Sequence, residues 1–408
     1  MMKRLEGGVT AAKGFQAAGI YAGIKKNNKS DMAMVYSEVP CIAAGTFTTN
    51  LVKAAPVKWD QKVVKESDSA QAIVVNSGVA NACTGEEGYQ SCMDMAKKAG
   101  EVLSIPQDAV LVASTGVIGK QLPMDIILNG IEKLKDALGD KLSDGTAAAE
   151  AIMTTDTISK QTAFEFEIGG KKVVLGGMCK GSGMIHPNMA TMLCFITTDI
   201  AIEKSLLQEA LSEVVKDTFN MISVDGDTST NDSVLLLANG RAENELNRKK
   251  GNEYEVFKEV LNKVMTSLSK KIAGDGEGAT ALLEVKVVNA KTKEQAIVLS
   301  KSVITSNLTK AAIFGHDANW GRILCAMGYS GAEFQPDKTD IYFESAAGCL
   351  QVVKNGMATD YSEGYATKIL SEAEVFVIVD IKEGEEMAIA WGCDLTYDYV
   401  KINADYRS

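Results

Sequence analysis

The sequence predicts an α/β protein in which mixed β-sheets are layered with helices. Three observations lead to this prediction. Segments with apolar residues at helical spacing alternate with β-type apolar runs, some of these runs are joined as hairpins by tight turns, and the connections are short. Hairpins place antiparallel strands side by side, so a strictly doubly wound parallel sheet is not expected.

Each element follows from its local pattern. Segments with apolar residues at helical spacing are predicted to be helices: 123–138, 144–153, 202–222, 253–272, 292–305 and 320–331. Short apolar runs between turn residues are predicted to be strands: 109–114, 192–199, 233–239 and 280–288. There are only six prolines and no Pro/Gly/Ser-rich linker, so the sequence marks no structural domain boundary.

Two hairpins are expected. TAFEFEI and KKVVLGG flank Gly169 and Gly170, and two glycines supply the positive φ angles that a tight hairpin turn needs. Near the end of the chain, AEVFVIVDIKEG (373–384) and EEMAIAWGCDL (385–395) are expected to pair in the same way.

Charge and hydropathy argue against several classes of partner. The formal net charge of −11 argues against nucleic acid and against an anionic membrane surface, because both are bound through basic patches. The start of the chain is basic but lacks a continuous apolar segment, so no signal peptide is expected. Nowhere do about eighteen apolar residues run together, so no membrane span is expected either. A cytoplasmic location is therefore predicted.

The cysteines and histidines offer little to a metal site. The eight cysteines contain no CxxC pair and are expected to be buried free thiols in a reducing compartment. The two histidines, His186 and His316, lack ligand-type spacing to cysteine or aspartate, which also disfavours a Ser-His-Asp triad. We therefore expect no metal site.

The motif VDGDTSTND (224–232) has two interpretations. Asp225 and Asp227, followed by a hydroxyl, are similar to the acidic loops of aspartyl-phosphate enzymes and of metal sites. Such a loop normally follows a strongly apolar strand, and MISV is a weak one. A polar loop with satisfied hydrogen bonds is therefore the favoured interpretation.

The segment KGSGMIHPNMATMLCFITTD (180–199) joins a loop rich in glycine and proline to a β-type run, and Ala190-Thr191 lies at the junction. A threonine hydroxyl attacks only when a base takes its proton. If the bond before Thr191 is cut, its own new α-amino group, with a reference pKa of about 7.7–8.0, can be that base. The threonine can make the cut itself by attacking the carbonyl of Ala190. The simpler alternative is a threonine that begins a strand.

KGSGMIHPNMATML closely resembles the self-cleavage segment of the ornithine acetyltransferases of arginine biosynthesis, also called glutamate N-acetyltransferases or the ArgJ family. The resemblance covers the whole chain, and its other motifs follow in the family's order: GVTAAKGFQAAGI, GTFTTNLVKAAPV, NSGVANACTG, ASTGVIG, AIMTTDT, SVDGDTSTND, GDGEGAT, FGHDANWGRI and YVKINADYRS. It implies mixed sheets layered with helices of the DmpA/ArgJ type. It also favours Thr191 as a nucleophile over the simpler alternative.

The resemblance implies that the precursor cuts itself between Ala190 and Thr191, and that an α chain 1–190 and a β chain 191–408 stay associated. Thr191 would be the nucleophile of a ping-pong reaction: N2-acetylornithine acetylates it, ornithine leaves, and glutamate takes the acetyl group. Acetyl-CoA is a further donor in some members. An assembly of two α and two β chains (α2β2) or larger is implied. No metal or cofactor is implied, because the nucleophile and its base come from one residue.

The resemblance also assigns roles to other residues. Thr115 and Gly116 in ASTGVIG would form the oxyanion hole, where glycine lets the backbone approach and threonine adds a hydroxyl. Lys180 would meet a substrate carboxylate, and Glu277 would meet a substrate amine. Taken alone, these residues equally fit a strand-to-helix turn, a surface lysine and a solvated loop tip.

Further substrate contacts are implied at four positions: Thr154, Thr191, Asn403 and Ser408. Ser408 departs from the family's usual terminal threonine but keeps the hydroxyl. His186 and Asn188 flank the junction, where they either assist cleavage or shape the bend.

Two other functions stay open. A self-processing amidohydrolase or aminopeptidase would use the same threonine but pass the acyl group to water. A small-molecule sensor would bind without turnover. Dependence of the product on glutamate separates a transferase from a hydrolase, and Thr191→Ala separates an enzyme that uses this threonine from a sensor.

Overall fold

The structure is a computed structural model that describes residues 2–26, 28–186 and 192–404. The chain forms two compact units. Unit 1 comprises Met1–Gly181, Pro187–Asn220 and Thr228–Leu268, and unit 2 comprises Ser182–His186, Met221–Asp227 and Ser269–Ser408. The predicted α/β class with mixed sheets layered with helices is confirmed. The division into chains 1–190 and 191–408 concerns cleavage and stays a prediction.

Unit 1 is built on a mixed sheet with the spatial order β1-β6-β7-β8-β9-β3-β4-β5, in which β2 also pairs with β3. The strands described are Lys3–Leu5 (β1), Phe15–Ile20 (β2), Met32–Phe47 (β3), Ala70–Val79 (β4), Val110–Val117 (β5), Lys160–Ile168 (β6), Lys171–Lys180 (β7), Leu193–Thr198 (β8) and Ser233–Ala238 (β9). The pairs β4–β5 and β8–β9 are parallel, and the other pairs are antiparallel. Strand β3 connects the two parts of the sheet, because it pairs with β2 and β4 near its start and with β9 near its end.

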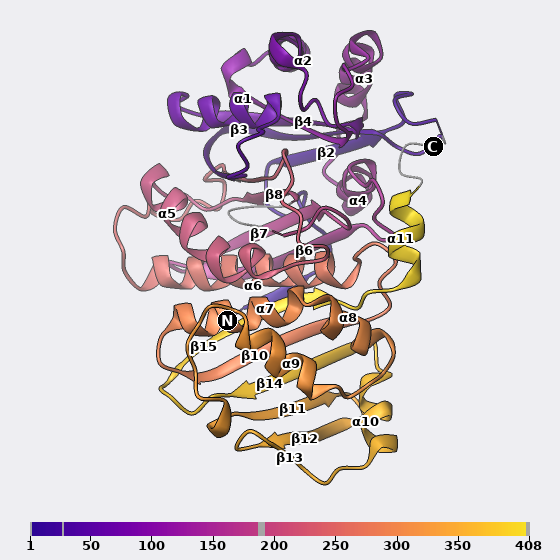
Figure 1. Ribbon diagram of the computed structural model, residues 1–408. Helices are drawn as coiled ribbons and strands as arrows, with labels where there is room; N and C mark the ends of the chain where they lie inside the picture. Colours follow the sequence, from indigo (N-terminus) through magenta and orange to yellow (C-terminus); the bar gives the residue numbers. More distant parts are fainter. Residues whose placement is uncertain (1, 27, 187–191, 405–408) are drawn as a thin grey trace. The chain divides into compact units, whose positions relative to one another are not determined.

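Helices cover the faces of this sheet. In Figure 1, α1, α2 and α3 lie on one side of β2, β3 and β4, and α5 and α6 lie beside β6, β7 and β8. The helices described are Ala55–Glu66 (α1), Gly85–Leu103 (α2), Met124–Ala137 (α3), Leu142–Ala151 (α4), Lys204–Val214 (α5) and Asn252–Gly274 (α6, whose last residues belong to unit 2). Their buried residues recur at helical spacing, as Ile127, Ile131 and Leu134 do in α3. The helices were predicted from this stripe of apolar residues.

Helix α4 packs on β2 through a glycine. A Cβ atom at Gly19 would lie 2.0 Å from the carbonyl oxygen of Ala147, so a side chain there cannot be accommodated without moving the helix. The helix begins where the carboxylate of Asp144 accepts the N–H of Lys141 at 2.9 Å. Because α4 leads into residues 152–156, the packing of α4 on Gly19 also positions part of the candidate site.

Unit 2 contains a second mixed sheet with the order β13-β12-β11-β14-β10-β15. The strands described are Leu282–Ala290 (β10), Asp340–Ser345 (β11), Gly348–Lys354 (β12), Met357–Ala358 (β13), Glu374–Asp380 (β14) and Glu386–Cys393 (β15). The helices described are Lys293–Thr305 (α7), Asn307–Phe314 (α8), Trp320–Gly328 (α9), Glu363–Leu370 (α10) and Tyr397–Ala404 (α11). Figure 1 shows α7, α8 and α9 on one face of this sheet.

The predicted hairpin at Gly169-Gly170 is confirmed. β6 and β7 pair antiparallel up to Ile168 and Lys171, and the two glycines between them have φ angles of +55° and +75°. These are the positive values that led to the prediction, and glycine adopts them without steric cost.

The second predicted hairpin is wrong in its pairing. Both strands form, but β10 lies between them, parallel to β14 and antiparallel to β15. The connection crosses the end of β10, where the N–H groups of Glu383 and Gly384 donate to the carbonyl of Asn289 at 2.8 and 2.9 Å. A Cβ atom at Gly384 would lie 2.3 Å from the carbonyl oxygen of Ala290, so glycine permits the crossing. Local sequence does not reveal a strand that inserts from ninety residues earlier.

The helix predicted at 202–222 is also too long. Helix α5 ends at Val214, and short 3-10 turns follow it. Thr218 has φ −125° and ψ −94°, and its hydroxyl donates to the carbonyl of Val214 at 2.7 Å, which competes with the regular helical bonds. The other predicted helices and strands are confirmed, with ends that differ by a few residues.

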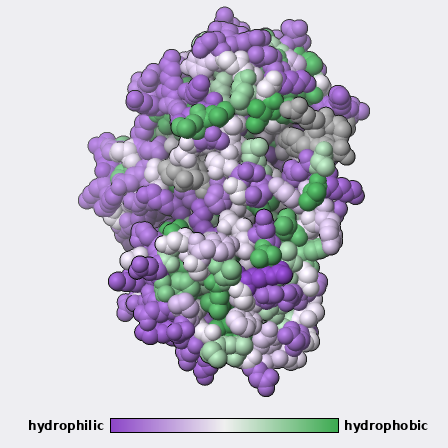
Figure 2. Space-filling model, in the orientation of Figure 1, coloured by the Kyte–Doolittle hydropathy of each residue, from purple (hydrophilic) through white to green (hydrophobic). Residues whose placement is uncertain are grey.

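Figure 2 shows hydrophilic side chains over α1–α3, whereas apolar side chains gather over α7–α9. Leu308, on α8, has a side chain that is 59% exposed. Of the helices in the described part of the chain, none is both long and apolar enough to cross a membrane.

We predict that Gly19→Ala destabilises the protein by about 1–3 kcal/mol, the usual cost of overpacking. The added methyl group meets the backbone of α4, which must move. A fall in the midpoint of thermal unfolding tests this. The matched control is Gly328→Ala, since the Cβ position at this helical glycine meets nothing within 4 Å. Equal melting of the Gly19→Ala variant and the wild type would contradict the prediction.

Candidate active site

The predicted residues Thr115 and Gly116 lie near the end of β5. Strands β4 and β5 are parallel and in register here, so Ser77 and Gly78 lie beside them. Gly116 has φ +128°, and a Cβ atom on it would lie 2.3 Å from the carbonyl carbon of Gly78. The position therefore requires glycine, both for its φ angle and for the close approach of the two backbones. The strand continues to Val117, so it includes the first three residues of TGVIG (115–119), which were interpreted as part of a strand-to-helix turn.

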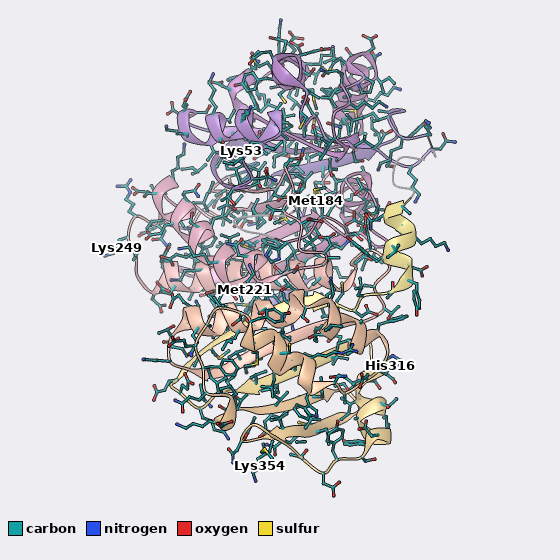
Figure 3. All side chains as sticks on the ribbon, viewed as in Figure 1. Lys53, Met184, Met221, Lys249, His316 and Lys354 are labelled. Atoms are coloured by element: carbon teal, nitrogen blue, oxygen red, sulfur yellow. The ribbon has the colours of Figure 1, made fainter. Side chains whose placement is uncertain are left out.

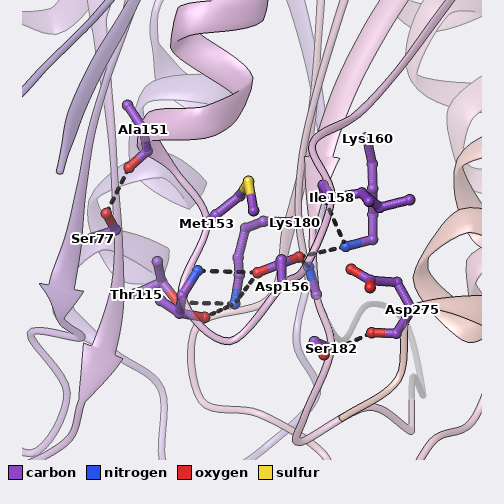
Figure 4. A network of polar contacts seen from close by, with 12 residues as sticks. Ser77, Thr115, Ala151, Met153, Asp156, Ile158, Lys160, Lys180, Ser182 and Asp275 are labelled. Carbon is purple, nitrogen blue, oxygen red and sulfur yellow. Dashed lines mark hydrogen bonds and ion pairs between the residues drawn. The ribbon is translucent and has the colours of Figure 1, made fainter. Parts of the chain in front are cut away.

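Lys180 is the last residue of β7, and its ammonium group lies among side chains from two other segments. Nζ donates to Thr154 Oγ1 at 2.7 Å. It also donates to Thr115 Oγ1 at 3.5 Å, and Figure 4 shows Lys180 beside Thr115 and Asp156. Lys180 is 8% exposed, so the interpretation as a surface lysine is wrong. Unit 1 thus brings together three predicted site residues that lie far apart in the sequence.

Asp156 lies at the centre of this cluster, and the sequence analysis missed it. Its Oδ1 accepts hydrogen bonds from Lys160 Nζ and from the N–H of Gly181, both at 2.7 Å. Its Oδ2 accepts the N–H of Thr154 at 3.0 Å and lies 3.9 Å from Lys180 Nζ. The side chains of Asp156 and Lys160 are fully buried. The available signal was a pair of opposite charges four residues apart in DTISK, at the start of a strand-like run.

The electrostatics of the cluster favour an ionised carboxylate. Burial opposes the charge on Asp156, but the charges of Lys180 and Lys160 and hydrogen bonds from Lys160 and Gly181 outweigh it, so the pKa lies below its ordinary value. Two ammonium groups then surround one carboxylate. The cluster is left with an excess positive charge, which a bound anion would neutralise.

A third lysine, Lys25, holds the turn that precedes Thr154. Its Nζ donates to the carbonyl oxygens of Met153 at 2.7 Å and Ser30 at 2.9 Å. The loop around it is fixed because the carboxylate of Asp31 accepts the N–H groups of residues 22–25. Lys25 could not be predicted as a site residue, because a lysine in a polar loop carries no local signal of burial.

A second buried carboxyl group in unit 1 belongs to Asp232, which immediately precedes β9. It is 2% exposed, and its Oδ2 has no hydrogen-bond partner within the described residues. Burial raises its pKa, against the effects of a hydrogen bond from Ser229 and of the charge of Lys180. The N–H of the next residue, Ser233, donates to the carbonyl of Met192 at 2.9 Å. This buried acid therefore lies beside the residue that follows the predicted nucleophile.

Unit 2 brings together Glu277 and Asn403. The amide Nδ2 of Asn403, on α11, donates to Glu277 Oε2 at 2.7 Å. Glu277 is 6% exposed, so it is not a solvated loop tip. A Cβ atom at Gly183 would lie 2.3 Å from the carboxyl carbon of Glu277, so glycine at 183 makes room for this side chain. The N–H of Glu277 also donates to the carbonyl of Ser182 at 3.0 Å.

The segment 182–186 is fixed in unit 2 by the acidic loop. Asp225 Oδ2 accepts the N–H of Met184 at 2.6 Å, and its Oδ1 accepts the N–H of Ile185 at 2.8 Å. Both carboxylate oxygens are thus used by the backbone. This arrangement supports the interpretation of 224–232 as a polar loop with satisfied hydrogen bonds over a phosphoryl-transfer or metal loop.

The two histidines have different surroundings. His186 Nδ1 lies 3.1 Å from Ser223 Oγ, and burial and the charge of Lys301 lower its pKa. His316 lies on an exposed turn after α8, as Figure 3 shows, and its Nδ1 is 3.4 Å from Ser371 Oγ. His186 therefore anchors the segment before the junction, and its part in cleavage stays a hypothesis.

Four residues named in the sequence analysis lie outside the described residues: Asn188, Ala190, Thr191 and Ser408. The roles of Ala190 and Thr191 in cleavage, of Thr191 as nucleophile and of Ser408 in substrate binding stay predictions. Within the ranges 2–26, 28–186 and 192–404, no group of three His, Cys, Asp or Glu residues is arranged to hold a metal ion. The eight cysteines are free thiols, but the prediction that they are buried is wrong for Cys83, Cys325 and Cys349, which are exposed.

The fold and these clusters define a class of protein. It is an α/β protein of mixed sheets with a buried lysine–carboxylate–threonine cluster in unit 1 and a buried glutamate in unit 2. The family model described as "ArgJ family" matches residues 16–408. The chain belongs to this family, and the prediction of an enzyme of arginine biosynthesis is confirmed.

The relatives support this assignment over their full length. The "Arginine biosynthesis bifunctional protein ArgJ" of Caldanaerobacter subterraneus subsp. tengcongensis is 52% identical over 407 residues, which cover 100% of both chains. The "Arginine biosynthesis bifunctional protein ArgJ 1" of Clostridium acetobutylicum is 55% identical over 400 residues, which cover 98% of this chain and 97% of that one.

A solved structure is also similar in sequence. It is that of an ornithine acetyltransferase complexed with ornithine from Mycobacterium tuberculosis, and it is 42% identical. The match covers 47% of this chain and 100% of that chain, with a TM-score of 0.44. A TM-score of this size does not establish a shared arrangement, so the family assignment rests on the sequences.

We predict that Lys25 titrates near pH 8, well below the value of about 10.4 for a lysine in a model peptide. Burial is the largest cause. Asp31 and Asp156 oppose it, whereas Lys180 and Lys29 add to it. The unfolded chain therefore binds more protons between these two pH values. The cost of burying the charged Lys25 is lost, and the free energy of unfolding rises, as pH rises through that window.

Competitive labelling with acetic anhydride, followed by mass spectrometry of the Lys25 peptide, measures this titration. The same peptide labelled in denaturant is the control and should titrate near the model value. Equal titration of Lys25 in the folded and denatured protein would contradict the prediction.

Proposed function

We propose that this chain is a self-processing acyltransferase with an N-terminal threonine, which moves the acetyl group of N2-acetylornithine to glutamate. Its relatives are named as bifunctional proteins of arginine biosynthesis, and its motifs resemble those of the ornithine acetyltransferases. The observation that carries the proposal is the convergence of Thr115, Thr154 and Lys180 in unit 1. These are residues to which the resemblance assigns the oxyanion hole and the substrate contacts.

Processing begins with the hydroxyl of Thr191. Its Oγ attacks the carbonyl carbon of Ala190, and the C–N bond breaks as the acyl group moves from nitrogen to oxygen. Water then hydrolyses the ester, which leaves a carboxylate on Ala190 and an α-amino group and a free hydroxyl on Thr191. The hydrogen bonds that hold residues 184 and 185 to Asp225 fix the chain shortly before this bond.

Acetyl transfer proceeds in two steps. The α-amino group of Thr191 takes the hydroxyl proton while Oγ attacks the acetyl carbonyl of N2-acetylornithine. The C–N bond breaks, the proton passes to the leaving amine, and ornithine departs. The neutral α-amine of glutamate then attacks the acetyl ester, the C–O bond breaks, and the amine proton returns to Oγ through the α-amino group. N-acetylglutamate leaves, and the free enzyme is restored.

The charged residues provide recognition. In each step a negative oxygen develops, and the Thr115 hydroxyl and the Gly116 N–H would stabilise it; one such donor typically contributes about 2.7–4 kcal/mol. The excess positive charge around Lys180 suits the α-carboxylate that donor and acceptor share. Glu277, aligned by Asn403, would meet a substrate amine, with the terminal Ser408 nearby in the sequence.

Three further features belong to this proposal. Acetyl-CoA would be a second donor, because a thioester can acylate the same threonine and release a thiol. The enzyme would need no metal or resident cofactor, because Thr191 supplies both nucleophile and base. The α and β pieces would assemble as an α2β2 heterotetramer or larger. A cytoplasmic location stays a prediction.

We predict that Thr191→Ala gives one polypeptide band on a denaturing gel, where the wild type gives two. Without Oγ, neither the acyl shift nor acetyl transfer can occur. Thr191→Ser keeps a hydroxyl and should still be cut, which makes it the matched control. A Thr191→Ala protein that is cut at the same bond would exclude self-cleavage by this residue.

Incubation with N2-acetylornithine tests the reaction itself. We expect ornithine to be released in proportion to added glutamate, with stoichiometric N-acetylglutamate. Release that ignores glutamate and yields free acetate would favour an amidohydrolase, because water would then be the acceptor. The same assay with acetyl-CoA and glutamate tests the second donor.

A further inference from the structure

The strongest unassigned feature is the buried ion pair between Asp156 and Lys160. Both side chains have no exposed surface, and their charged atoms lie 2.7 Å apart. Burial of two charges costs several kcal/mol per ion before their attraction is counted, and well-packed apolar residues often serve stability equally well. Stability alone is therefore a weak reason for this pair.

The other contacts of Asp156 all lead to the candidate site. Its carboxylate accepts N–H groups from Thr154 and Gly181, and Lys180 Nζ lies 3.9 Å away. Thr154 Oγ1 and Lys180 Nζ are themselves joined at 2.7 Å. One carboxylate thus fixes the backbone on both sides of this contact, because Gly181 directly follows Lys180.

Lys160 affects the charge that remains on Lys180. Lys160 makes the shorter contact with Asp156 and neutralises the carboxylate. Lys180 lies further from Asp156 and donates hydrogen bonds to two threonine hydroxyls. If Lys160 were neutral, Lys180 would be the main counter-ion of Asp156. Its charge would then be shared with the protein and less available to a ligand.

The geometry points to Asp156 as a positioning residue that holds the Lys180 ammonium group for the carboxylate of both substrates, with Lys160 as the counter-ion that leaves Lys180 its charge. This inference rests on the proposed function. Neither Asp156 nor Lys160 has to touch the substrate, since they act through Lys180, Thr154 and the backbone at Gly181.

The test removes the pair without leaving a buried charge. Asp156→Asn alone would leave Lys160 as an unpaired buried charge, which strongly destabilises a protein. The double variant Asp156→Asn/Lys160→Met avoids this and keeps the approximate volume. If it does not fold, Asp156→Asn/Lys160→Gln serves the same test, because its two amides can hydrogen-bond.

We predict that the folded double variant is cut normally and has KM values about tenfold or more higher for both N2-acetylornithine and glutamate, with a smaller change in kcat. Lys180→Gln should raise KM in the wild type but much less in the double-variant background, because Lys180 is already misplaced there. If the pair served stability alone, Lys180→Gln would raise KM by the same factor in the wild type and in the folded double variant.

The matched control is Asp60→Asn. Asp60 is another fully buried carboxyl group of unit 1, and it accepts the N–H of Val112 at 2.8 Å on the strand that carries Thr115. Burial raises the pKa of the Asp60 carboxyl group, and asparagine has nearly the same shape, so Asp60→Asn is a conservative replacement. The KM values of the Asp60→Asn variant should equal those of the wild type.

The outcomes separate the two proposals. Wild-type protein that shows no glutamate-dependent transfer overturns the proposed function, whatever the variants do. Wild-type transfer combined with unchanged KM values in the double variant overturns only the positioning role. A double variant that stays uncut also overturns it, because the role assigned to Asp156 concerns substrate and not cleavage.

Discussion

The arrangement of the candidate site in unit 1 depends on the buried, ionised carboxylate of Asp156. Such a group is tolerated only when its oxygens are hydrogen-bonded and its charge is balanced. Asp156 meets this requirement by drawing donors from the turn after α4, from the start of β6 and from the end of β7. The constraint works in both directions, since each segment that satisfies the carboxylate is also fixed by it. Thr154 and Lys180 therefore meet although twenty-six residues separate them.

Glycines form a second level of constraint, because they let backbones and carboxylates come closer than any side chain would allow. Gly116 lies against Gly78 between two parallel strands, and Gly183 makes room for the carboxylate of Glu277. Gly19 does the same for α4. Glycine-rich stretches in this chain are thus points of close packing at the site as well as turns. Glycine is therefore required next to the candidate site residues, at Gly116 beside Thr115 and at Gly183 opposite Glu277.

Local chemistry made much of the fold predictable from the sequence. The hairpin at Gly169-Gly170 and most helices follow from patterns within about twenty residues. The pairing of β14 and β15 could not be predicted in this way, because β10 inserts between them. Asp156 was missed for a related reason: its partners come from segments whose proximity only the fold creates. Thr115, Thr154 and Lys180 were found through a family resemblance, whereas periodicity alone would have left Lys180 on the surface.

The net charge of −11 and the positive cluster around Lys180 act on different scales. A surplus of acidic groups on a solvated surface is screened within roughly 10 Å by salt, so it governs encounters with large polyanions. Two ammonium groups around one carboxylate in a buried cluster are screened far less, and they set the local potential. An acidic protein can therefore repel nucleic acid and still bind a small carboxylate. Under the proposed function, both substrates carry such a carboxylate, and the buried charge balance among Asp156, Lys160 and Lys180 is what would select it.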